Sequence, residues 1–280
     1  MTRALFRPAA VAASAKGRDG GVPAPLLVPA LLAVAFLVLP LFGLVVRAPW
    51  GQLGPQLTRP GVGEALRLSL VSATLATAVS LLLGVPLAWV LARSRVRGRS
   101  LLRALVTVPL VLPPVVGGVA LFLVLGRQGI LGRWLFEATG FALPFTTAAV
   151  VVAETFVAMP FLVISVEGAL RAADARFEEA AATLGADRWT TFRRVTLPLV
   201  APGIAAGAVL CWARALGEFG ATLLFGGNSP GTTRTLPTDV LTVFSNNPAD
   251  APALALPLIA AAVIILGALR ERWLRPVAAA

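Results

Sequence analysis

The sequence predicts an all-α polytopic membrane protein with six transmembrane helices. Hydrophobic residues make up 58% of its 280 residues and charged residues only 13%, and the mean hydropathy is +0.86. These values lie outside the usual soluble range. Six apolar runs approach or exceed the roughly 20 residues needed to cross a hydrocarbon core of about 30 Å. Lys and Arg cluster between these runs and favour alternate loops, as the positive-inside rule requires of a multi-pass protein.

The candidate spans follow one another with short connections. They cover Ala24 to Val46, Ala65 to Ala92, Ala104 to Leu125, Phe145 to Val166, Leu199 to Phe225 and Ala251 to Leu269. The first lacks a small-residue cleavage motif, so we expect it to be a retained span rather than a signal peptide. Pro109, Pro113 and Pro114 interrupt the third span and predict a kink, which either is static or bends to line a pathway.

The charges of the loops predict the orientation of the chain. One set of loops carries 17 Lys and Arg residues and the opposite set carries 5. We therefore expect both termini in the cytoplasm, with residues 1–23 and 271–280 as tails and residues 24–270 as one six-helix domain.

Missing residue types exclude several chemistries. The chain has no His, no Tyr, one Cys and one Lys, which excludes disulfides and Cys/His metal sites. Lys16 lies in an Ala-Ser-Ala-Lys-Gly stretch and not in a Gly-rich phosphate loop. We expect no cofactor on this chain, and ATP, if it drives the protein, must bind to a separate subunit. The net charge of +11 is spread in clusters between apolar runs, with no basic stripe interleaved with aromatics, so a nucleic-acid partner is not expected.

The longest polar connection, residues 167–198, reads as helical and should be cytoplasmic. Asp174 can cap a first helix, with Glu178 and Glu179 in its first turns, and Gly185 can end it in a left-handed conformation. A second short helix can start at Asp187.

That second helix would carry Trp189 and Phe192 on one face, and Pro198 suits the first turn of the fifth span. In the simplest interpretation the whole segment is only a charged loop with an amphipathic face.

The spacing within this segment resembles a known motif. It consists of Glu179-Ala180-Ala181, three residues, Gly185, nine residues, Val195, one residue, then Leu197-Pro198. This resembles the EAA loop of binding-protein-dependent ABC importer permeases, with Val195 where the pattern usually has Ile. The resemblance implies type I permease architecture and a coupling helix that docks on an ATPase subunit, with Leu184 among the coupling residues. It also implies two ATPase subunits, a second copy of this chain and a periplasmic or lipoprotein binding protein.

Ionisable residues within the apolar runs are candidates for a transport pathway. Arg214 and Glu218, four residues apart, would share a helix face in the fifth span, and each charge costs about 2.5 to 3.5 kcal/mol to insert. They form either a neutralising pair that holds helices together or part of the path or gate. Glu154, in the fourth span, is either a proton-relay carboxylate or a buried group hydrogen-bonded to a neighbouring helix. Phe219 and Thr222 complete the set of gate candidates.

A second resemblance concerns the substrate. Residues 215–222, read as Ala-Leu-Gly-Glu-Phe-Gly-Ala-Thr, precede Gly227-Asn228 and a Thr-Arg-Thr-Leu-Pro segment at 233–237. Together they resemble the last third of molybdate importer permeases, whereas the Gly-Glu-Phe-Gly-Ala part alone is also similar to sulfate and thiosulfate permeases. The resemblance implies a non-catalytic inner-membrane subunit that translocates molybdate, with ATP and Mg²⁺ in the partner subunit. The alternatives are a sulfate, thiosulfate or tungstate permease, an ion-coupled secondary transporter, and a membrane scaffold without conduction.

Overall fold

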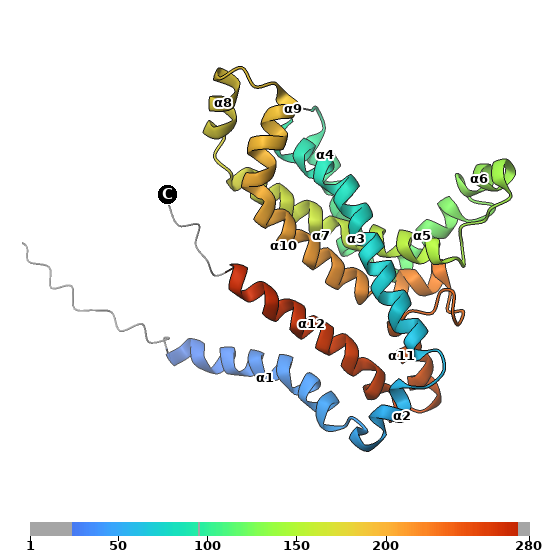
Figure 1. Cartoon of the computed structure of the whole chain (residues 1–280). Helices are drawn as coiled ribbons and strands as arrows, with labels where there is room; N and C mark the ends of the chain where they lie inside the picture. The colour runs from blue at the N-terminus through green and yellow to red at the C-terminus, as the bar shows by residue number, and fades with distance from the viewer. Residues whose placement is uncertain (1–23, 95, 274–280) are drawn as a thin grey trace, which may run out of the picture. The chain divides into compact units, whose positions relative to one another are not determined.

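A computed structural model describes residues 24–94 and 96–273 (Figure 1). Every regular element in these ranges is a helix, as the composition predicted. The chain divides into two compact units, one up to Val46 and the other from Arg47 onward, and each is described by itself. The predicted tail 1–23 and residues 274–280 of the predicted C-terminal tail lie outside the described residues.

The first unit is the helix α1 (Ala24–Val46), which is long and apolar enough to cross a membrane. Its leucine, valine and phenylalanine side chains are mostly exposed, and none of its described side chains is buried. A helix that is apolar on all sides fits a lipid environment and not water. Its bounds match the first predicted span.

The second unit contains the remaining helices in chain order. They are η1 (Trp50–Gln52), α2 (Leu53–Leu57), α3 (Val62–Arg93), α4 (Arg99–Val111), α5 (Pro114–Leu125), α6 (Gly132–Thr139), α7 (Thr147–Ala172), α8 (Arg176–Thr183), α9 (Arg188–Thr191), η2 (Phe192–Thr196), α10 (Leu197–Leu216), η3 (Thr222–Gly226), α11 (Leu236–Asn246) and α12 (Ala251–Trp273). Figure 1 shows α3, α7 and α10 running side by side, with α8 and α9 together at one end of this bundle.

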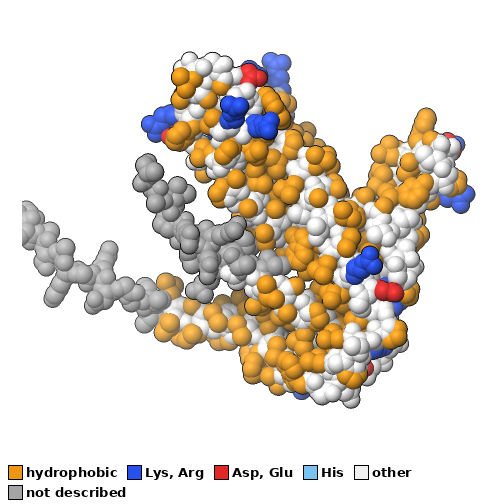
Figure 2. Space-filling view, viewed as in Figure 1, with side chains coloured by type: hydrophobic (Ala, Val, Ile, Leu, Met, Phe, Trp, Pro, Cys, Tyr) orange, Lys and Arg blue, Asp and Glu red, His pale blue; other side chains and the backbone are white. Residues whose placement is uncertain are grey.

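Small residues let α3, α7 and α10 approach closely. A Cβ atom on Gly84 of α3 would lie 3.2 Å from side-chain atoms of Leu162 and Val163 on α7. A Cβ atom on Gly207 of α10 would lie 2.9 Å from the Cβ atom of Ser165. Lipid does not push apolar helices together as water does, so close van der Waals packing of this kind holds the bundle. Large apolar side chains instead cover much of the outer face (Figure 2).

The predicted spans are distributed unevenly over the described helices. Four helices satisfy the length and hydropathy of a span: the one in the first unit, α3, α7, and a continuous helix over residues 188–216. The third predicted span is broken, because α4 and α5 meet at an angle of 116° across Leu112 and Pro113. This confirms the predicted kink and gives its cause, since proline cannot continue the backbone ladder. In α12 the apolar stretch among the described residues is the shorter range Ala251–Ile264.

The fifth span is a correction to the sequence-based prediction. We expected one helix through to Phe225, but α10 ends at Leu216, residues 217–219 break the helix, and the chain becomes helical again at Gly220 and leads into η3. The carboxylate of Glu218 accepts a hydrogen bond from the backbone N–H of Ala221 at 2.9 Å and so satisfies one group freed by the break. A break inside an apolar segment persists only where such partners exist within the protein.

Candidate functional site

The loop between α7 and α10 contains the first helix that its sequence predicted, although Ala175 and not Asp174 is the N-cap of α8. An oxygen of Asp174 accepts a hydrogen bond from the backbone N–H of Arg176 at 3.0 Å, and this bond holds the pKa of the Asp174 carboxyl below its usual range. Gly185 has a φ of +84°, the left-handed conformation expected of a glycine that ends a helix. The N–H of Ala186 then bonds to the carbonyl of Ala181 at 3.0 Å, which closes the end of α8.

The second predicted helix of the loop is also present. Asp187 caps α9 by accepting a hydrogen bond from the backbone N–H of Thr190 at 3.0 Å. From Arg188 the helix continues through η2 and α10 without a break, so the 29-residue helix begins ten residues before Pro198. Pro198 does occupy the first turn of the segment assigned as α10.

The motif residues divide into an exposed and a packed group. Glu179, Ala180 and Leu184 are exposed on α8 and its end, and Leu184 keeps 88% of its surface in contact with solvent. Val195 and Leu197 are half-buried, farther along the chain.

A second glutamate, which the motif did not single out, attaches this loop to the helices. Oε1 of Glu178 lies 3.3 Å from Nη2 of Arg93 at the end of α3 and accepts a hydrogen bond from the hydroxyl of Thr196 at 3.0 Å. Arg93 also donates to the carbonyl of Ala173, at 3.2 Å. Through Glu178, α8 is therefore connected to the end of α3 and to Thr196, the last residue of η2 before α10. Two sequence features could have indicated this contact: Glu178 is an acidic residue beside the motif, and Arg93 follows the end of an apolar run.

A neighbouring ion cluster explains why α7 continues to Ala172 although the loop was predicted from Glu167. The Glu167 carboxylate is buried between Arg103 of α4, at 2.5 Å, and Arg171, at 2.7 Å. With two cationic partners, Glu167 can be a helical residue inside the protein instead of a solvated loop residue.

At the far end of α10, the predicted charge pair is formed. Nη1 of Arg214 lies 2.6 Å from Oε2 of Glu218, although the angles there do not make a hydrogen bond. Glu218 is buried, with 1% exposure, and Arg214 is 27% exposed. Glu218 lies just beyond the helix and not on a helix face shared with Arg214, because the chain turns at Gly217. The pair closes the turn that begins the break.

The structure brings Glu154 to the same place. The carboxylate of Glu154 on α7 accepts a hydrogen bond from the hydroxyl of Ser72 on α3 at 2.8 Å, so a hydrogen bond to a neighbouring helix is confirmed. It is also close enough to interact electrostatically with Glu218. The second oxygen of Glu154 and the hydroxyl of the fully buried Thr222 have no hydrogen-bond partner in the described part of the chain. Sequence reasoning missed Ser72, which belongs to a row of small polar residues on α3.

Arg214, Glu218 and Glu154 thus form one polar cluster, to which α3 contributes Ser72. Half-buried Phe219 lies in the break, and buried Thr222 begins η3 just after it. The motif residues of the loop lie elsewhere. Sixteen residues of helix separate Pro198 from Arg214, about 24 Å at 1.5 Å per residue. The two groups of predicted site residues are therefore connected by α10 and do not touch.

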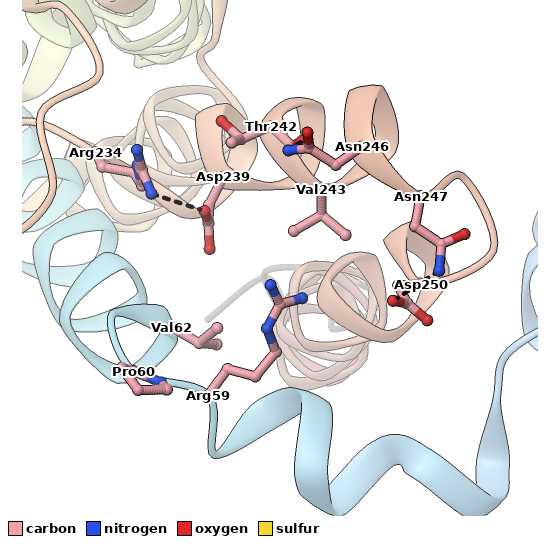
Figure 3. A pocket seen from close by; sticks show the side chains of 10 residues that line it. All are labelled: Arg59, Pro60, Val62, Arg234, Asp239, Thr242, Val243, Asn246, Asn247 and Asp250. Carbon is pink, nitrogen blue, oxygen red and sulfur yellow. Dashed lines mark hydrogen bonds and ion pairs between the residues drawn. The ribbon is translucent and has the colours of Figure 1, made fainter.

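A third polar site lies near the start of α3, around α11. A cavity there has a volume of about 150 Å³. Figure 3 shows the side chains that line it: Arg59, Pro60, Val62, Arg234, Asp239, Thr242, Val243, Asn246, Asn247 and Asp250. Burial raises the pKa of the Asp239 carboxyl, while Arg234 and Arg59 oppose this shift. Two arginines and two aspartates nearly balance, so the cavity does not form a positive trap for an anion.

Arg234 explains the Thr-Arg-Thr-Leu-Pro segment. Its guanidinium donates to the side-chain oxygen of Asn228 at 3.2 Å and lies 3.5 Å from Asp239 on α11. The amide of Asn228 in turn donates to the hydroxyl of Thr242 at 3.0 Å. The two sequence patches that carried the second resemblance, Gly227-Asn228 and residues 233–237, are thus one folded loop held by Arg234.

Apolar helices, a buried polar cluster where a helix breaks, and a charged loop whose exposed face is tied to two of those helices define a class of protein. This is a multi-pass membrane protein with the features of a transport component.

Comparison with known proteins gives the family. Residues 80–276 match the binding-protein-dependent transport system inner membrane component family. The chain is 49% identical over 247 residues to the molybdenum transport system permease protein ModB of Mycobacterium tuberculosis, covering 88% of this chain and 93% of that relative. It is 40% identical over 211 residues to ModB of Escherichia coli K12, covering 75% of this chain and 92% of that protein.

A solved structure shares the fold. A bacterial ABC transporter involved in the import of the acidic polysaccharide alginate contains a chain similar to this one with a TM-score of 0.66 and 20% identity, over 89% of this chain and 93% of that one. The protein belongs to the family of binding-protein-dependent transport system inner membrane components. The family that the loop spacing predicted is thereby confirmed, and the chain is an ABC importer permease of the inner membrane.

Proposed function

We propose that this chain is the non-catalytic permease subunit of a molybdate importer. The observation that carries the proposal is the 49% identity over most of the chain to a molybdenum transport permease. The Arg234-held loop supports it, because both sequence patches that favoured molybdate over sulfate fold together there. The near-neutral cavity beside that loop fits a path that must release its ion and not retain it.

In the complete transporter, two copies of this chain would pair with two ATPase subunits and a molybdate-binding protein outside the membrane. ATP and Mg²⁺ would bind to the ATPase subunits, and this chain would carry no cofactor. The exposed Leu184 and the alanines of α8 supply an apolar docking face for an ATPase subunit. With the α8 end in the cytoplasm, both termini would be cytoplasmic as the charge bias predicts.

The coupling would run from α8 through Glu178 to α3 and α10, and along α10 to the break at Gly217. There the Arg214–Glu218 pair and Glu154 would hold one of two arrangements of the helices. A nucleotide-driven shift of α8 would favour the other arrangement. The ATPase subunit would then bind the two arrangements with different affinities, as any ligand that drives a conformational change must.

The test is ATPase activity of the reconstituted transporter, comprising this chain, its candidate ATPase subunit and its candidate binding protein. Molybdate, tungstate and sulfate would be supplied in turn. Stimulation that requires the binding protein and is strongest with molybdate is the expected result. Stimulation by sulfate alone would contradict the molybdate assignment but leave the role as an importer permease intact. Failure to associate with any ATPase subunit would contradict the coupling role.

A further inference from the structure

A groove unrelated to the polar cluster lies between the end of α3 and the start of the long helix that contains α10. Its volume is about 410 Å³, and its walls are Pro86, Trp89, Val90, Arg188, Trp189 and Phe192. Its lining residues come from the end of α3 and from the segment 188–192, and Figure 1 shows α9 beside α8 at one end of the bundle. The groove is open along one side of the molecule.

Aromatic rings form most of the wall. The ring of Trp189 stacks on that of Phe192, with centroids 5.7 Å apart. Trp89 meets Phe192 edge-on at 6.5 Å. Trp189 is still 66% exposed, although it is the largest ring of the loop. Such a wall offers extended apolar contact to a hydrocarbon chain and almost no hydrogen-bonding groups.

The lengths of the helices set the depth of the groove in the membrane. The helix that begins at Arg188 has 29 residues and is about 43 Å long, whereas the hydrocarbon core is about 30 Å thick. Its first turns therefore extend into the headgroup region. On α3, Trp89 lies four residues before the final Arg93, about 6 Å along the axis. Tryptophans are enriched at this depth of a membrane.

One cation stands at the mouth of the groove. Arg188 is exposed, and its side chain makes no ion pair or hydrogen bond within the described ranges. No Asp or Glu lines the groove, and the neighbouring carboxylate of Asp187 is engaged by Thr190. Figure 2 shows further basic side chains gathered at this end of the bundle. The charge complements an anion held at headgroup depth.

We propose that this groove binds an anionic phospholipid of the leaflet that faces α8 and α9. One acyl chain lies along the rings of Trp89, Trp189 and Phe192, and the phosphate pairs with Arg188. The lipid then contacts both the end of α3 and α9. Its headgroup charge therefore changes how strongly the coupling loop is bound to α3. This requires only that the chain spans a membrane, and it does not depend on the cargo.

The experiment uses the full chain in detergent after removal of lipid. Phosphatidylglycerol with brominated acyl chains is titrated in, and quenching of tryptophan fluorescence is followed. Saturable quenching is expected, with brominated phosphatidylcholine binding about fivefold more weakly, because its choline cation offsets the attraction of its phosphate to Arg188. Inorganic phosphate should not compete, because it lacks the acyl chain.

Two variants with the same loss of charge locate the site. Arg188→Gln should weaken phosphatidylglycerol binding about fivefold, and Arg194→Gln, on the same helix but outside the groove wall, should leave it unchanged. Near-ultraviolet circular dichroism checks that the ring cluster is intact in both. Equal effects of the two variants, or equal binding of both lipids, would overturn the proposal. Complete loss of quenching once the ATPase subunit is bound would assign the groove to the subunit interface instead.

Discussion

Replacing Glu218 by alanine perturbs two interactions at once. The carboxylate pairs with Arg214 through one oxygen, at 2.6 Å, and accepts the backbone N–H of Ala221 through the other, at 2.9 Å. The alanine variant leaves a guanidinium without its anion and a buried N–H without its acceptor. Glu218→Gln removes the charge but keeps an oxygen that can accept the N–H bond, so the two contributions can be separated.

The magnitudes follow from burial. Breaking a buried ion pair by removing one partner costs about 3 to 5 kcal/mol. Because Arg214 keeps 27% exposure, its stranded charge is partly solvated and the lower end, about 3 kcal/mol, applies. The orphaned N–H adds about 1 to 3 kcal/mol. Removing both charged partners leaves only this second penalty, so Arg214→Ala combined with Glu218→Ala should be less harmful than Glu218→Ala alone, by about 3 kcal/mol.

The assay is the free energy of unfolding in mixed detergent micelles, measured for the wild type, both single variants and the double variant, with uptake into proteoliposomes beside it. Glu218→Gln should fall between the wild type and Glu218→Ala. If the free-energy losses of Arg214→Ala and Glu218→Ala simply add, the two side chains are not coupled and the reasoning fails.

Three further predictions follow from local geometry. Gly118→Ala should destabilise the protein by about 1 to 3 kcal/mol, because the added Cβ atom would lie 3.0 Å from backbone atoms of Ala221. The control Gly117→Ala should cost less in the same melting experiment, because its Cβ atom would meet the ring of Phe156, which can move. Gly185→Trp should leave the protein in the membrane but uncouple ATP hydrolysis, since the bulky side chain enters the docking face at a left-handed position; retained coupling would contradict this. Glu178→Gln should reduce stimulation of ATP hydrolysis by the binding protein about two- to fivefold without blocking assembly, because it removes the ion pair with Arg93. An equal loss in Glu179→Gln would show that this ion pair is not responsible.

Features determined by neighbouring residues could be predicted from the sequence. The spans follow from apolar runs, the two helices of the loop from capping by Asp187 and termination at Gly185, and the kink in the third span from its prolines. Each depends on interactions over one or two turns of chain. The spacing of the loop motif also identified the family without any knowledge of the fold.

Features that need a partner far along the chain could not be predicted. Ser72 and Glu154 are 82 residues apart, and Arg103 and Glu167 are 64 apart, so only packing of α3, α4 and α7 brings them together. Glu178 looked like an ordinary acidic residue in a first helical turn until the fold placed Arg93 beside it.

The break after Leu216 shows most directly which features the sequence determines and which require the tertiary structure. By composition, residues 199–225 read as one apolar helix, because hydropathy records only which side chains prefer lipid. The sequence alone determined that this segment lies in the membrane and carries Arg214 and Glu218. Only the tertiary structure decided that the helix stops at Leu216, because such a break persists only where a group such as the buried Glu218 carboxylate accepts a freed N–H, here that of Ala221.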